Sequence, residues 1–497
     1  MDFSLIADFG TTNMKAGIVN NEGEILASKS TPVDLSRPEK GAVIHDPVKL
    51  YDDFCKLVKG MSAKYRQDIK TIVLSGYQFG FMPMDQNDRP LTGMITLLDT
   101  RSKNIMVKLQ KELPFKEIYQ KTGCPPLFTY IMARLFWLKQ EKKDIFKKSS
   151  WFADIKSFLI NKLCGKALTE PSMASVTQLF NLHQQEWDQQ LLDLAGIDIS
   201  QLPEVVSGNQ IVGTISSKAA DDLGLGNNIA IIPGVYDGGS MMIGMGGYDS
   251  SLGICNLGTT AMFRSCSTEP LIDDPDLMRM QTYCLTEDRY AIGGAINNAG
   301  VMLRWFRDNL STEKEYKKIV ENSADIPAGS EGLFCFPFLT GERDPRIGNL
   351  AFASLLGIKE YHSSRHVSRA LLEGVGFSLN LIKQALEENN VFLDKVIIGG
   401  SGSKDDLWCQ ILADIFNLKI AKSTVEDSAL IGGAILAATA NGKFADIQQA
   451  AEAMIDYGKE FNPSLDNVKT YSESFSFYSE MLKKYQDIYR MHQDYYG

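Results

Sequence analysis

The tripeptide Gly-Thr-Thr occurs twice between short apolar runs in this chain of 497 residues. The first copy lies in LIADFGTTNMKAGIV, residues 5–19, and the second in ICNLGTTAMF, residues 254–263. The two copies are 248 residues apart (258 − 10), which is half the chain. Apolar runs on both sides of a glycine turn predict a strand, a turn and a second strand. The repeat therefore predicts a duplicated α/β protein with domains at residues 1–247 and 248–497.

Each of these turns can bind an anion. Backbone N–H groups and two hydroxyls can surround phosphate oxygens, and glycine permits close approach. In the first copy Asp8 ends the strand, where its charge would repel a phosphate unless a cation lay between them. Mg²⁺ binds one or two carboxylates together with phosphate oxygens, so Asp8 is a candidate metal ligand. A single copy could be a plain hairpin, but two copies half a chain apart favour a duplicated nucleotide clamp.

The composition excludes several classes of partner. A net charge of −10 and a pI of about 5.2 argue against a nucleic-acid-binding surface. We expect neither a signal peptide nor a membrane helix, because no apolar stretch is long enough. The eight cysteines form no C-x-x-C pair, which is typical of free thiols in a reducing compartment. These features predict a cytoplasmic protein that acts on a small molecule.

A candidate general base follows a buried strand near the middle of the chain. Residues 227–246, NNIAIIPGVYDGGSMMIGMG, predict a strand, an acidic turn and a helix of small residues. A carboxylate within hydrogen-bond reach of a hydroxyl can take its proton while the hydroxyl attacks phosphorus. Asp237 is the candidate for this role, and Gly238 and Gly239 would let the substrate approach. The alternative is that Asp237 only caps the helix.

A third glycine turn lies near the C-terminus, in VIIGGSGSKDDLW, residues 396–408. Gly399, Gly400 and Gly402 follow a predicted strand and precede a helix. Without Cβ atoms, these positions allow a flat base or a ribose to come close. A tight strand-to-helix turn is the alternative, because such a turn is not specific on its own.

Taken in order, these motifs resemble the FGGY family of carbohydrate kinases within the actin-like ATPase superfamily. DFGTTNMKAGIV and NLGTTAMF resemble its two phosphate loops, and ARLFWL resembles its K-L-x-W-L signature with Arg134 in place of lysine. Residues 351–373, AFASLLGIKEYHSSRHVSRALLE, fit its second signature. IGGSGSKDDLWCQILADIF resembles the adenosine motif, and ALIGGAILAATANGKF resembles the late glycine-rich helix. The resemblance covers nearly the whole chain.

The resemblance implies two ribonuclease-H-like domains that flank a deep cleft, with ATP and Mg²⁺ as cofactors. It implies transfer of the γ-phosphate to a sugar hydroxyl, with Asp237 as the catalytic aspartate and with Asp8 and Asp237 at the metal. Oligomeric state is left open, with family precedent leaning toward a homodimer. The residues implied to contact the nucleotide are Gly10, Thr11, Thr12, Lys15, Gly258, Thr259, Thr260, Gly399, Gly400, Ser401 and Gly402.

The first half contains two segments that bear on the choice of sugar. Gln78 and Phe79, in SGYQFGFMPMD, stand where xylulose kinases usually carry Gln-Met-His-Gly. Asp99 remains from a W-x-D-x-R segment whose tryptophan is replaced by Leu97. Arg101 of that segment either holds a substrate carboxylate or pairs with Asp99, and pairing is favoured.

The second half contains the segment that is most informative about the sugar. GGAINNAGVMLRWFRD, residues 293–308, is similar to the gluconate kinase branch, and the amide of Asn298 suits a polyhydroxy chain. D-Gluconate is therefore the first candidate substrate, D-xylulose the second, and another ketose or polyol the third. A non-metabolic actin-like ATPase, such as a chaperone or filament protein, is the alternative from a different class.

Overall fold

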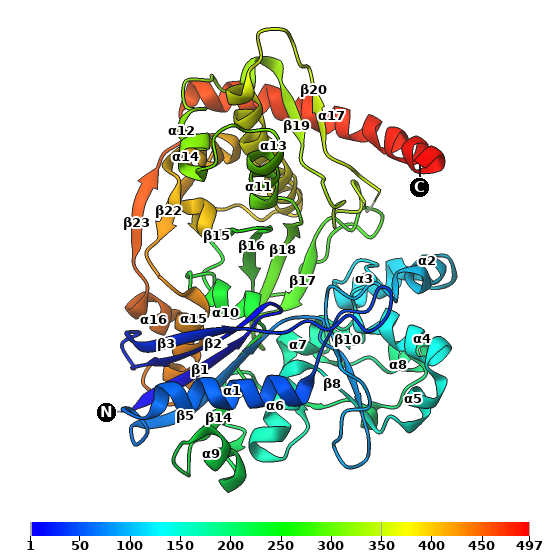
Figure 1. Cartoon of the computed structure of the whole chain (residues 1–497), viewed down its shortest axis with the longest axis vertical. Coiled ribbons are helices and arrows are strands. Elements are labelled where there is room, and N and C mark those ends of the chain that lie inside the picture. The colour runs from blue at the N-terminus through cyan, green and yellow to red at the C-terminus, as the bar shows by residue number, and fades with distance from the viewer. Residues whose placement is uncertain (1, 349, 497) are drawn as a thin grey trace.

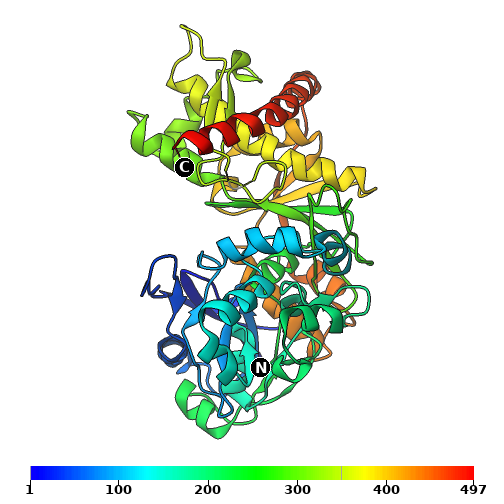
Figure 2. The same ribbon diagram turned by 90° about the vertical axis from the view of Figure 1, so that its right-hand side faces the viewer.

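The computed structural model describes residues 2–348 and 350–496. Two α/β lobes, each built on a mixed sheet, lie one above the other along the long axis (Figure 1). On one side the N-terminal lobe carries an insertion that includes α2 to α5 (residues 103–148), and the C-terminal helix α17 (Leu465–Tyr496) lies across the far side of the other lobe (Figure 2). This is the two-domain α/β fold that the family resemblance implies.

The sheet of the first lobe has the strand order β13-β14-β5-β1-β2-β3. β1, β2 and β3 form an antiparallel meander, while β5 and β14 run parallel to β1. The buried strands are nearly continuous apolar runs, as expected for strands covered on both faces. Its strands are β1 (Phe3–Phe9), β2 (Asn13–Val19), β3 (Ile25–Pro32), β5 (Ile69–Gly76), β13 (Gly213–Thr214) and β14 (Ala230–Ile232).

The sheet of the second lobe repeats this plan, with the order β17-β18-β16-β15-β21-β22-β23. β15, β16 and β18 form the antiparallel meander, and β21 and β22 run parallel to β15. The duplication predicted from Gly-Thr-Thr is therefore present in the strand topology. Its strands are β15 (Leu252–Leu257), β16 (Ala261–Ser267), β17 (Gln281–Cys284), β18 (Tyr290–Ile296), β21 (Lys395–Gly399), β22 (Lys419–Ser423) and β23 (Tyr457–Phe461).

Two equivalent helices pack together between the sheets. α10 (Asp237–Ile243) follows β14 in the first lobe, and α15 (Ser428–Ala440) follows β22 in the second. A Cβ atom on Gly432 would lie 1.8 Å from the Ser240 carbonyl oxygen, and one on Gly244 would lie 1.9 Å from that of Ser428. The glycines of the late helix thus serve a close helix crossing.

One apolar core joins the two lobes around this helix pair. Ile6 and Val73 of the first sheet, Ile254 and Ile397 of the second, and Leu430 of α15 belong to one buried cluster. Burying an aliphatic side chain of this size contributes about 1.5–3 kcal/mol. This shared core holds the two sheets in a fixed position relative to each other.

The remaining elements surround the two sheets, and among the described residues no helix is both long and apolar enough to cross a bilayer. The other helices are α1 (Pro47–Ser62), α2 (Lys103–Glu112), α3 (Phe115–Thr122), α4 (Ile131–Glu141), α5 (Lys143–Lys148), α6 (Ile155–Cys164), α7 (Pro171–Ser175), α8 (Gln189–Ala195), α9 (Ser217–Leu223), α11 (Gly300–Asn309), α12 (Tyr316–Glu321), α13 (Ser364–Glu388), α14 (Asp406–Phe416), α16 (Ile447–Met454) and α17 (Leu465–Tyr496). The short strands are β4 (Ile44–His45), β6 (Met82–Met84), β7 (Met94–Ile95), β8 (Trp151–Ala153), β9 (Leu168–Thr169), β10 (Phe180–Asn181), β11 (Glu186–Trp187), β12 (Glu204–Val205), β19 (Phe334–Phe336) and β20 (Ser354–Leu356).

Candidate active site

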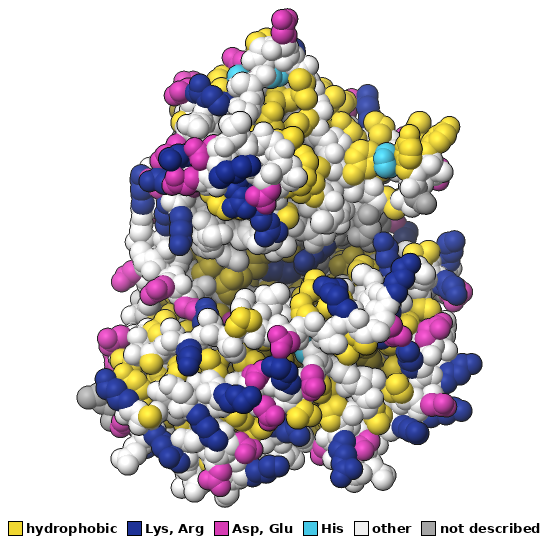
Figure 3. All heavy atoms as spheres, viewed as in Figure 1, with side chains coloured by type: hydrophobic (Ala, Val, Ile, Leu, Met, Phe, Trp, Pro, Cys, Tyr) yellow, Lys and Arg dark blue, Asp and Glu magenta, His cyan; other side chains and the backbone are white. Residues whose placement is uncertain are grey.

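A hollow separates the two lobes, with basic and hydrophobic side chains on its floor (Figure 3). One cavity of about 880 Å³ is lined from both lobes, and a second of about 840 Å³ is lined by the second lobe. Ser401 and Lys404 line both cavities, so the two adjoin. The first cavity includes Asp8, Lys15, Asp237, Gly238, Asn256, Gly399, Gly400 and Asp427, and the second includes Gly258, Thr259, Gly300, Arg304, Tyr316, Gly402, Asp405 and Trp408.

The first Gly-Thr-Thr turn joins β1 to β2 and is supported from behind by a histidine. Gly10 N–H donates to the Asn13 carbonyl at 2.9 Å and closes the turn. Nε2 of buried His45 lies 3.0 Å from the Thr11 carbonyl oxygen, and Nδ1 of the same ring lies 2.9 Å from the Tyr77 hydroxyl. The Thr12 side chain is exposed. This arrangement fixes the turn from the protein side and leaves its tip open.

Asp8 lies at the end of β1, directly opposite Lys15 on β2. The Ser75 hydroxyl donates to its carboxylate at 2.8 Å. Burial raises the pKa of Asp8, and the charge of Asp427 raises it further, against the lowering effects of Ser75 and Lys15. Lys15 itself forms an ion pair with Asp427, which precedes α15 in the other lobe. Acidic groups from both lobes thus meet at this end of the cleft.

Asp237 is the first residue of α10, and the N-cap position belongs to Tyr236. Its carboxylate accepts a hydrogen bond from Gly238 N–H at 2.8 Å. Burial, followed by the charge of Asp8, raises the pKa of Asp237 to about 7. A carboxyl group with a pKa near neutrality suits proton transfer, because its ionised form is both populated and basic.

A buried ion pair supports the start of α10. Lys156 Nζ lies 2.6 Å from Glu170 Oε1, and both side chains are fully buried. The Ser172 hydroxyl donates to Glu170 at 2.8 Å and accepts from Tyr236 N–H at 2.9 Å. This chain of contacts ends one residue before Asp237, and the charge of Lys156 also partly offsets the raised pKa of Asp237.

The second Gly-Thr-Thr turn joins β15 to β16 and docks on the start of α11. Gly300 N–H donates to the Gly258 carbonyl at 2.9 Å, and Val301 N–H donates to the Thr259 carbonyl at 3.1 Å. The side chains of Thr259 and Thr260 remain exposed. The turn is therefore held from behind, as the first one is, but by helix backbone instead of a histidine.

The glycine turn after β21 approaches this second turn closely. Gly400 has φ of +86°, and a Cβ atom there would lie 2.6 Å from Asn256 Oδ1 and 2.7 Å from the Leu257 carbonyl oxygen. Only glycine fits such a position without displacement. Residues 399–402 thus lie beside the phosphate turn of the second lobe, where the two cavities adjoin.

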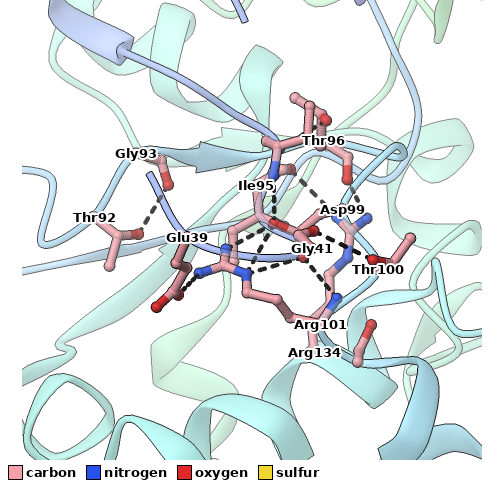
Figure 4. A network of polar contacts seen from close by, with 12 residues as sticks. Glu39, Gly41, Thr92, Gly93, Ile95, Thr96, Asp99, Thr100, Arg101 and Arg134 are labelled. Carbon is pink, nitrogen blue, oxygen red and sulfur yellow. Dashed lines mark hydrogen bonds and ion pairs between the residues drawn. The ribbon is translucent and has the colours of Figure 1, made fainter. Parts of the chain in front are cut away.

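The Gln78–Phe79 loop is tied to the insertion of the first lobe by a buried arginine. Arg134 donates to the carbonyls of Phe79, Ile95 (3.3 Å) and Thr96 (2.6 Å) (Figure 4). Phe79 has φ of 65°, an uncommon backbone conformation for a bulky residue. Gln78 Nε2 is buried with no hydrogen-bond partner in the described chain. A donor left in this state is available to a ligand hydroxyl.

Arg101 is committed to neighbouring side chains, which confirms the favoured pairing with Asp99. Its guanidinium lies 2.8 Å from Asp99 Oδ2 and 2.6 Å from Glu39 Oε1 (Figure 4). It also stacks 4.3 Å above the centre of the Trp137 ring. Asp99 additionally accepts from Val43 N–H at 3.0 Å. Contact of Asp99 with a sugar stays a prediction.

Asn298 is fully buried and its amide group binds a neighbouring loop. Its Nδ2 donates to the Gly341 carbonyl at 2.8 Å and to Glu342 at 3.3 Å, while its Oδ1 accepts from both N–H and hydroxyl of Thr340 at 3.2 Å. Burial raises the pKa of Glu342 to about 7. The predicted sugar contact of Asn298 is untested, and it would require this network to open.

The donor set of the cleft is suited to Mg²⁺ shared with phosphate oxygens. No group of three or more His, Cys, Asp or Glu side chains within the described residues is placed to hold a metal alone. Mg²⁺ commonly uses only one or two carboxylates and completes its shell with phosphate and water. Asp8 and Asp237 supply two such carboxylates, and burial raises the pKa of both.

Sequence reasoning did not identify the residues behind the site. His45, Lys156, Glu170 and Asp427 belong to none of the motifs quoted from the sequence. A buried lysine and glutamate 14 residues apart gave no local signal that they would pair. Only the folded chain brings these groups to the first turn and to α10.

Comparison with known proteins agrees with this geometry. The model for the N-terminal domain of the FGGY family of carbohydrate kinases matches residues 3–244, and that for the C-terminal domain matches residues 253–441. The chain belongs to this family. It is thus an ATP-dependent sugar kinase, a phosphotransferase with an alcohol acceptor, and the non-metabolic ATPase alternative is excluded.

Relatives named for two different sugars have the same sequence identity to this FGGY kinase. Xylulose kinase of Staphylococcus xylosus is 27% identical over 96% of this chain and 99% of its own. Gluconokinase of Bacillus subtilis is 27% identical over 94% and 93%. Crystal structures of a xylulose kinase and a gluconate kinase from Lactobacillus acidophilus each align with a TM-score of 0.93 at 28% identity, over 97% of this chain and 98% of theirs. Overall similarity therefore does not decide the sugar.

Proposed function

We propose that this kinase phosphorylates D-gluconate, with D-xylulose or another ketose or polyol as the second candidate. The observation that carries the proposal is the segment at residues 293–308, which is similar to the gluconate kinase branch. The start of α11 within it supports the second phosphate turn through Gly300 and Val301. The equal similarity to a gluconokinase and a xylulose kinase keeps the second candidate in place.

In this proposal Asp237 is the general base. Its carboxylate takes the proton of the acceptor hydroxyl as that oxygen attacks the γ-phosphorus of ATP, and the bond to the β–γ bridging oxygen breaks. A pKa of about 7 in the free protein supports the role, since both protonation states are accessible near neutral pH. The Lys156–Glu170 pair and Ser172 keep the carboxylate in position.

The nucleotide is proposed to span the two adjoining cavities. The adenosine end would lie in the second cavity near Gly402, Ser401 and Trp408. The phosphates would lie between the two Gly-Thr-Thr turns, within reach of Lys15. Asp8 and Asp237 would hold Mg²⁺ there, which would neutralise charge on the phosphate oxygens.

The acceptor is proposed to bind on the first-lobe side of the cleft. Gln78 offers its unpartnered amide, and Phe79 lies in the apolar cluster formed with Tyr130 of the first lobe and Tyr283 of the second. Closing of the lobes would exclude water, which competes with the sugar as acceptor. A cytoplasmic location and a homodimer remain predictions.

A coupled ADP-release screen over D-gluconate, D-xylulose, D-ribulose and glycerol tests the proposal. We expect the highest kcat/KM with D-gluconate and weak hydrolysis of ATP without acceptor. Much faster turnover of D-xylulose would overturn the gluconate assignment and leave the kinase assignment intact.

A further inference from the structure

Three arginines of the described chain are buried, and they differ in what neutralises them. Arg134, Arg264 and Arg369 are 1%, 5% and 5% exposed. Arg369 pairs with Glu373 at 2.9 Å, and Arg134 donates to three backbone carbonyls. Across the described residues the guanidinium of Arg264 finds acceptors only on Gln281, at 2.9 Å to the side-chain oxygen and 3.4 Å to the carbonyl.

This pairing leaves the charge of Arg264 poorly compensated. A buried guanidinium normally lies beside a carboxylate, because removing it from water costs several kcal/mol. One neutral amide oxygen, one long contact to a carbonyl and the face of the Tyr283 ring at 5.0 Å offset only part of that cost. The side-chain oxygen of Gln281 occupies the place that a carboxylate oxygen would take in a bidentate pair.

The sheet of the second lobe provides a space for this guanidinium. Arg264 on β16 and Gln281 on β17 are both paired with Gly293 on the intervening strand β18. Because paired residues on neighbouring strands point to the same face, the missing side chain of Gly293 leaves a gap between them. Gly293 has φ of +123°, and a Cβ atom there would lie 2.4 Å from the Phe263 carbonyl oxygen. The gap is thus maintained by the backbone.

This face of the sheet meets the first lobe beside the proposed base. Arg264 lies 5.0 Å from the centre of the Tyr283 ring. The Tyr283 hydroxyl is 2.6 Å from that of Tyr130 in the first lobe, and its ring contacts Tyr236 edge-on at 6.4 Å. Tyr236 directly precedes Asp237, and its buried hydroxyl has no partner among the described residues. Arg264 therefore lies behind Tyr283, at the place where β17 contacts the first lobe next to the residue that precedes Asp237.

We propose that Arg264 binds the carboxylate of a sugar-acid acceptor by displacing the amide of Gln281. This inference rests on the proposed function and assigns the anionic group of the substrate to a residue. The carboxylate and the hydroxyl that is phosphorylated would lie at opposite ends of the acceptor, one at Arg264 and the other at Asp237. A neutral ketose gains nothing from this contact, so Arg264 distinguishes sugar acids from ketoses.

Substitution of Arg264 tests the proposal through the ratio of two acceptors. For Arg264→Gln we expect kcat/KM with D-gluconate to fall by about thirty- to a thousandfold, the usual effect of losing one partner of a buried charged contact. With D-xylulose, and for ATP hydrolysis without acceptor, it should change by less than about threefold. Arg264→Lys should lose about tenfold with D-gluconate, because the charge stays but the two-pronged geometry is lost.

Gln281→Glu provides a second test that does not risk the fold. It keeps the size of the side chain and gives Arg264 a permanent carboxylate partner. We expect unchanged or higher thermal stability and a loss of at least about tenfold in kcat/KM for D-gluconate. Arg369→Gln is the matched control for loss of a buried arginine, and it should lower stability without changing the ratio of the two acceptors.

The outcomes separate this inference from the proposed function. Equal losses with both acceptors in Arg264→Gln would overturn it, because they would indicate a structural role. Loss of acceptor-free ATP hydrolysis would also overturn it, since Arg264 would then serve the transferred phosphate. Preference of the wild-type enzyme for another sugar acid would overturn D-gluconate alone, and the same ratio would then be measured with that acid. A wild-type enzyme that uses only neutral acceptors overturns both.

Discussion

The two lobes share one topology but place different side chains at equivalent positions. Asp8, next to last in β1, is paired with Lys15, whereas at the matching position β15 carries the neutral Asn256 paired with Met262. Each lobe also has an aspartate at the start of the helix that follows its outer parallel strand. These are Asp237 at α10 and Asp427 at α15.

These two aspartates differ in position and in partners, since Asp427 is the N-cap of α15 and Asp237 is the first residue of α10. Asp427 forms an ion pair with Lys15 and caps α15 through Leu430 N–H at 3.3 Å. Asp237 forms no ion pair among the described residues, and burial keeps its pKa near 7. The carboxylate of Asp427 is thus already occupied by a lysine of the chain, whereas that of Asp237 has no such basic partner in the part of the chain that the structure describes. This difference supports the proposal that Asp237, and not Asp427, takes the proton.

Exchanging each aspartate for asparagine breaks this comparison most strongly. Asp237→Asn keeps the size of the side chain and removes the base, so turnover should fall by about a hundred- to ten-thousandfold. Asp427→Asn removes a paired acid and should lower turnover by less than about tenfold. Steady-state kinetics with calorimetric measurement of ATP binding would check both. Similar losses in the two variants would contradict the assignment of Asp237 as the base.

Exchanging the residues before the two turns gives the next largest effect. Asp8→Asn makes the first turn resemble the second, and turnover should fall by about a hundred- to a thousandfold, as when one electrostatic contact to a transition state is lost. The Mg²⁺ concentration needed for half-maximal activity should rise.

The reverse change, Asn256→Asp, serves as the matched variant. A new negative charge near the phosphates should weaken ATP binding by about tenfold. If Asp8→Asn left the Mg²⁺ dependence unaltered, the first turn would be an ordinary hairpin.

Removing the charge of Lys156, the cation near Asp237, should have a smaller effect on activity. That effect should appear in the pH dependence of kcat/KM. For the wild type, kcat/KM should rise with pH and level off above about 7, because the ionised carboxylate is the active form. The double variant Lys156→Met, Glu170→Gln avoids an unpaired buried charge. Both charges of the pair are removed, but that of Lys156 acts more strongly on Asp237 and lowers its pKa, so the inflection should move slightly to higher pH. An unshifted inflection would mean that the pair only supports the fold.

Substitutions at the glycines of the α10–α15 crossing test whether the two lobes contribute equally to it. These substitutions should have the smallest effect on catalysis. Gly244→Ala and Gly432→Ala each place a methyl group against a backbone oxygen of the partner helix. Each should reduce the free energy of unfolding by about 1–3 kcal/mol. Gly226→Ala is the control, because a Cβ atom there meets nothing within 4 Å. Urea denaturation would measure all three, and a clear difference between Gly244→Ala and Gly432→Ala would show that the crossing is not symmetric.

The parts of the fold that local patterns could predict are the hairpins and the strands that lead into turns. The two Gly-Thr-Thr turns and the strand before Asp237 were recognisable because apolar runs and glycines are close in sequence. The support of the first turn by His45, and of α10 by Lys156 and Glu170, depends on contacts between distant segments. No periodicity in the sequence encodes such contacts.

The segment at residues 293–308, from which D-gluconate was inferred, shows a second limit of prediction from the sequence. Its amides suited a polyhydroxy chain, yet Asn298 binds the loop at residues 340–342 with every polar atom of its side chain. Arg264, in contrast, belongs to no recognised motif and lies in an ordinary strand pattern. Its lack of a carboxylate partner among the described residues depends on Gln281 of another strand, and no local pattern in the sequence indicates it.

The position of α15 has a consequence for how the chain is synthesised. This helix belongs to the second half but packs on β1, β2 and β5, with Gly433 against Ile6 and Leu430 against Gly17. One apolar face of the first sheet therefore stays uncovered until α15 leaves the ribosome, roughly 200 residues after α10, or about 10–40 s at ordinary translation rates. During that interval part of the apolar face of the first sheet is exposed to solvent. Its native state becomes accessible only when translation is nearly complete.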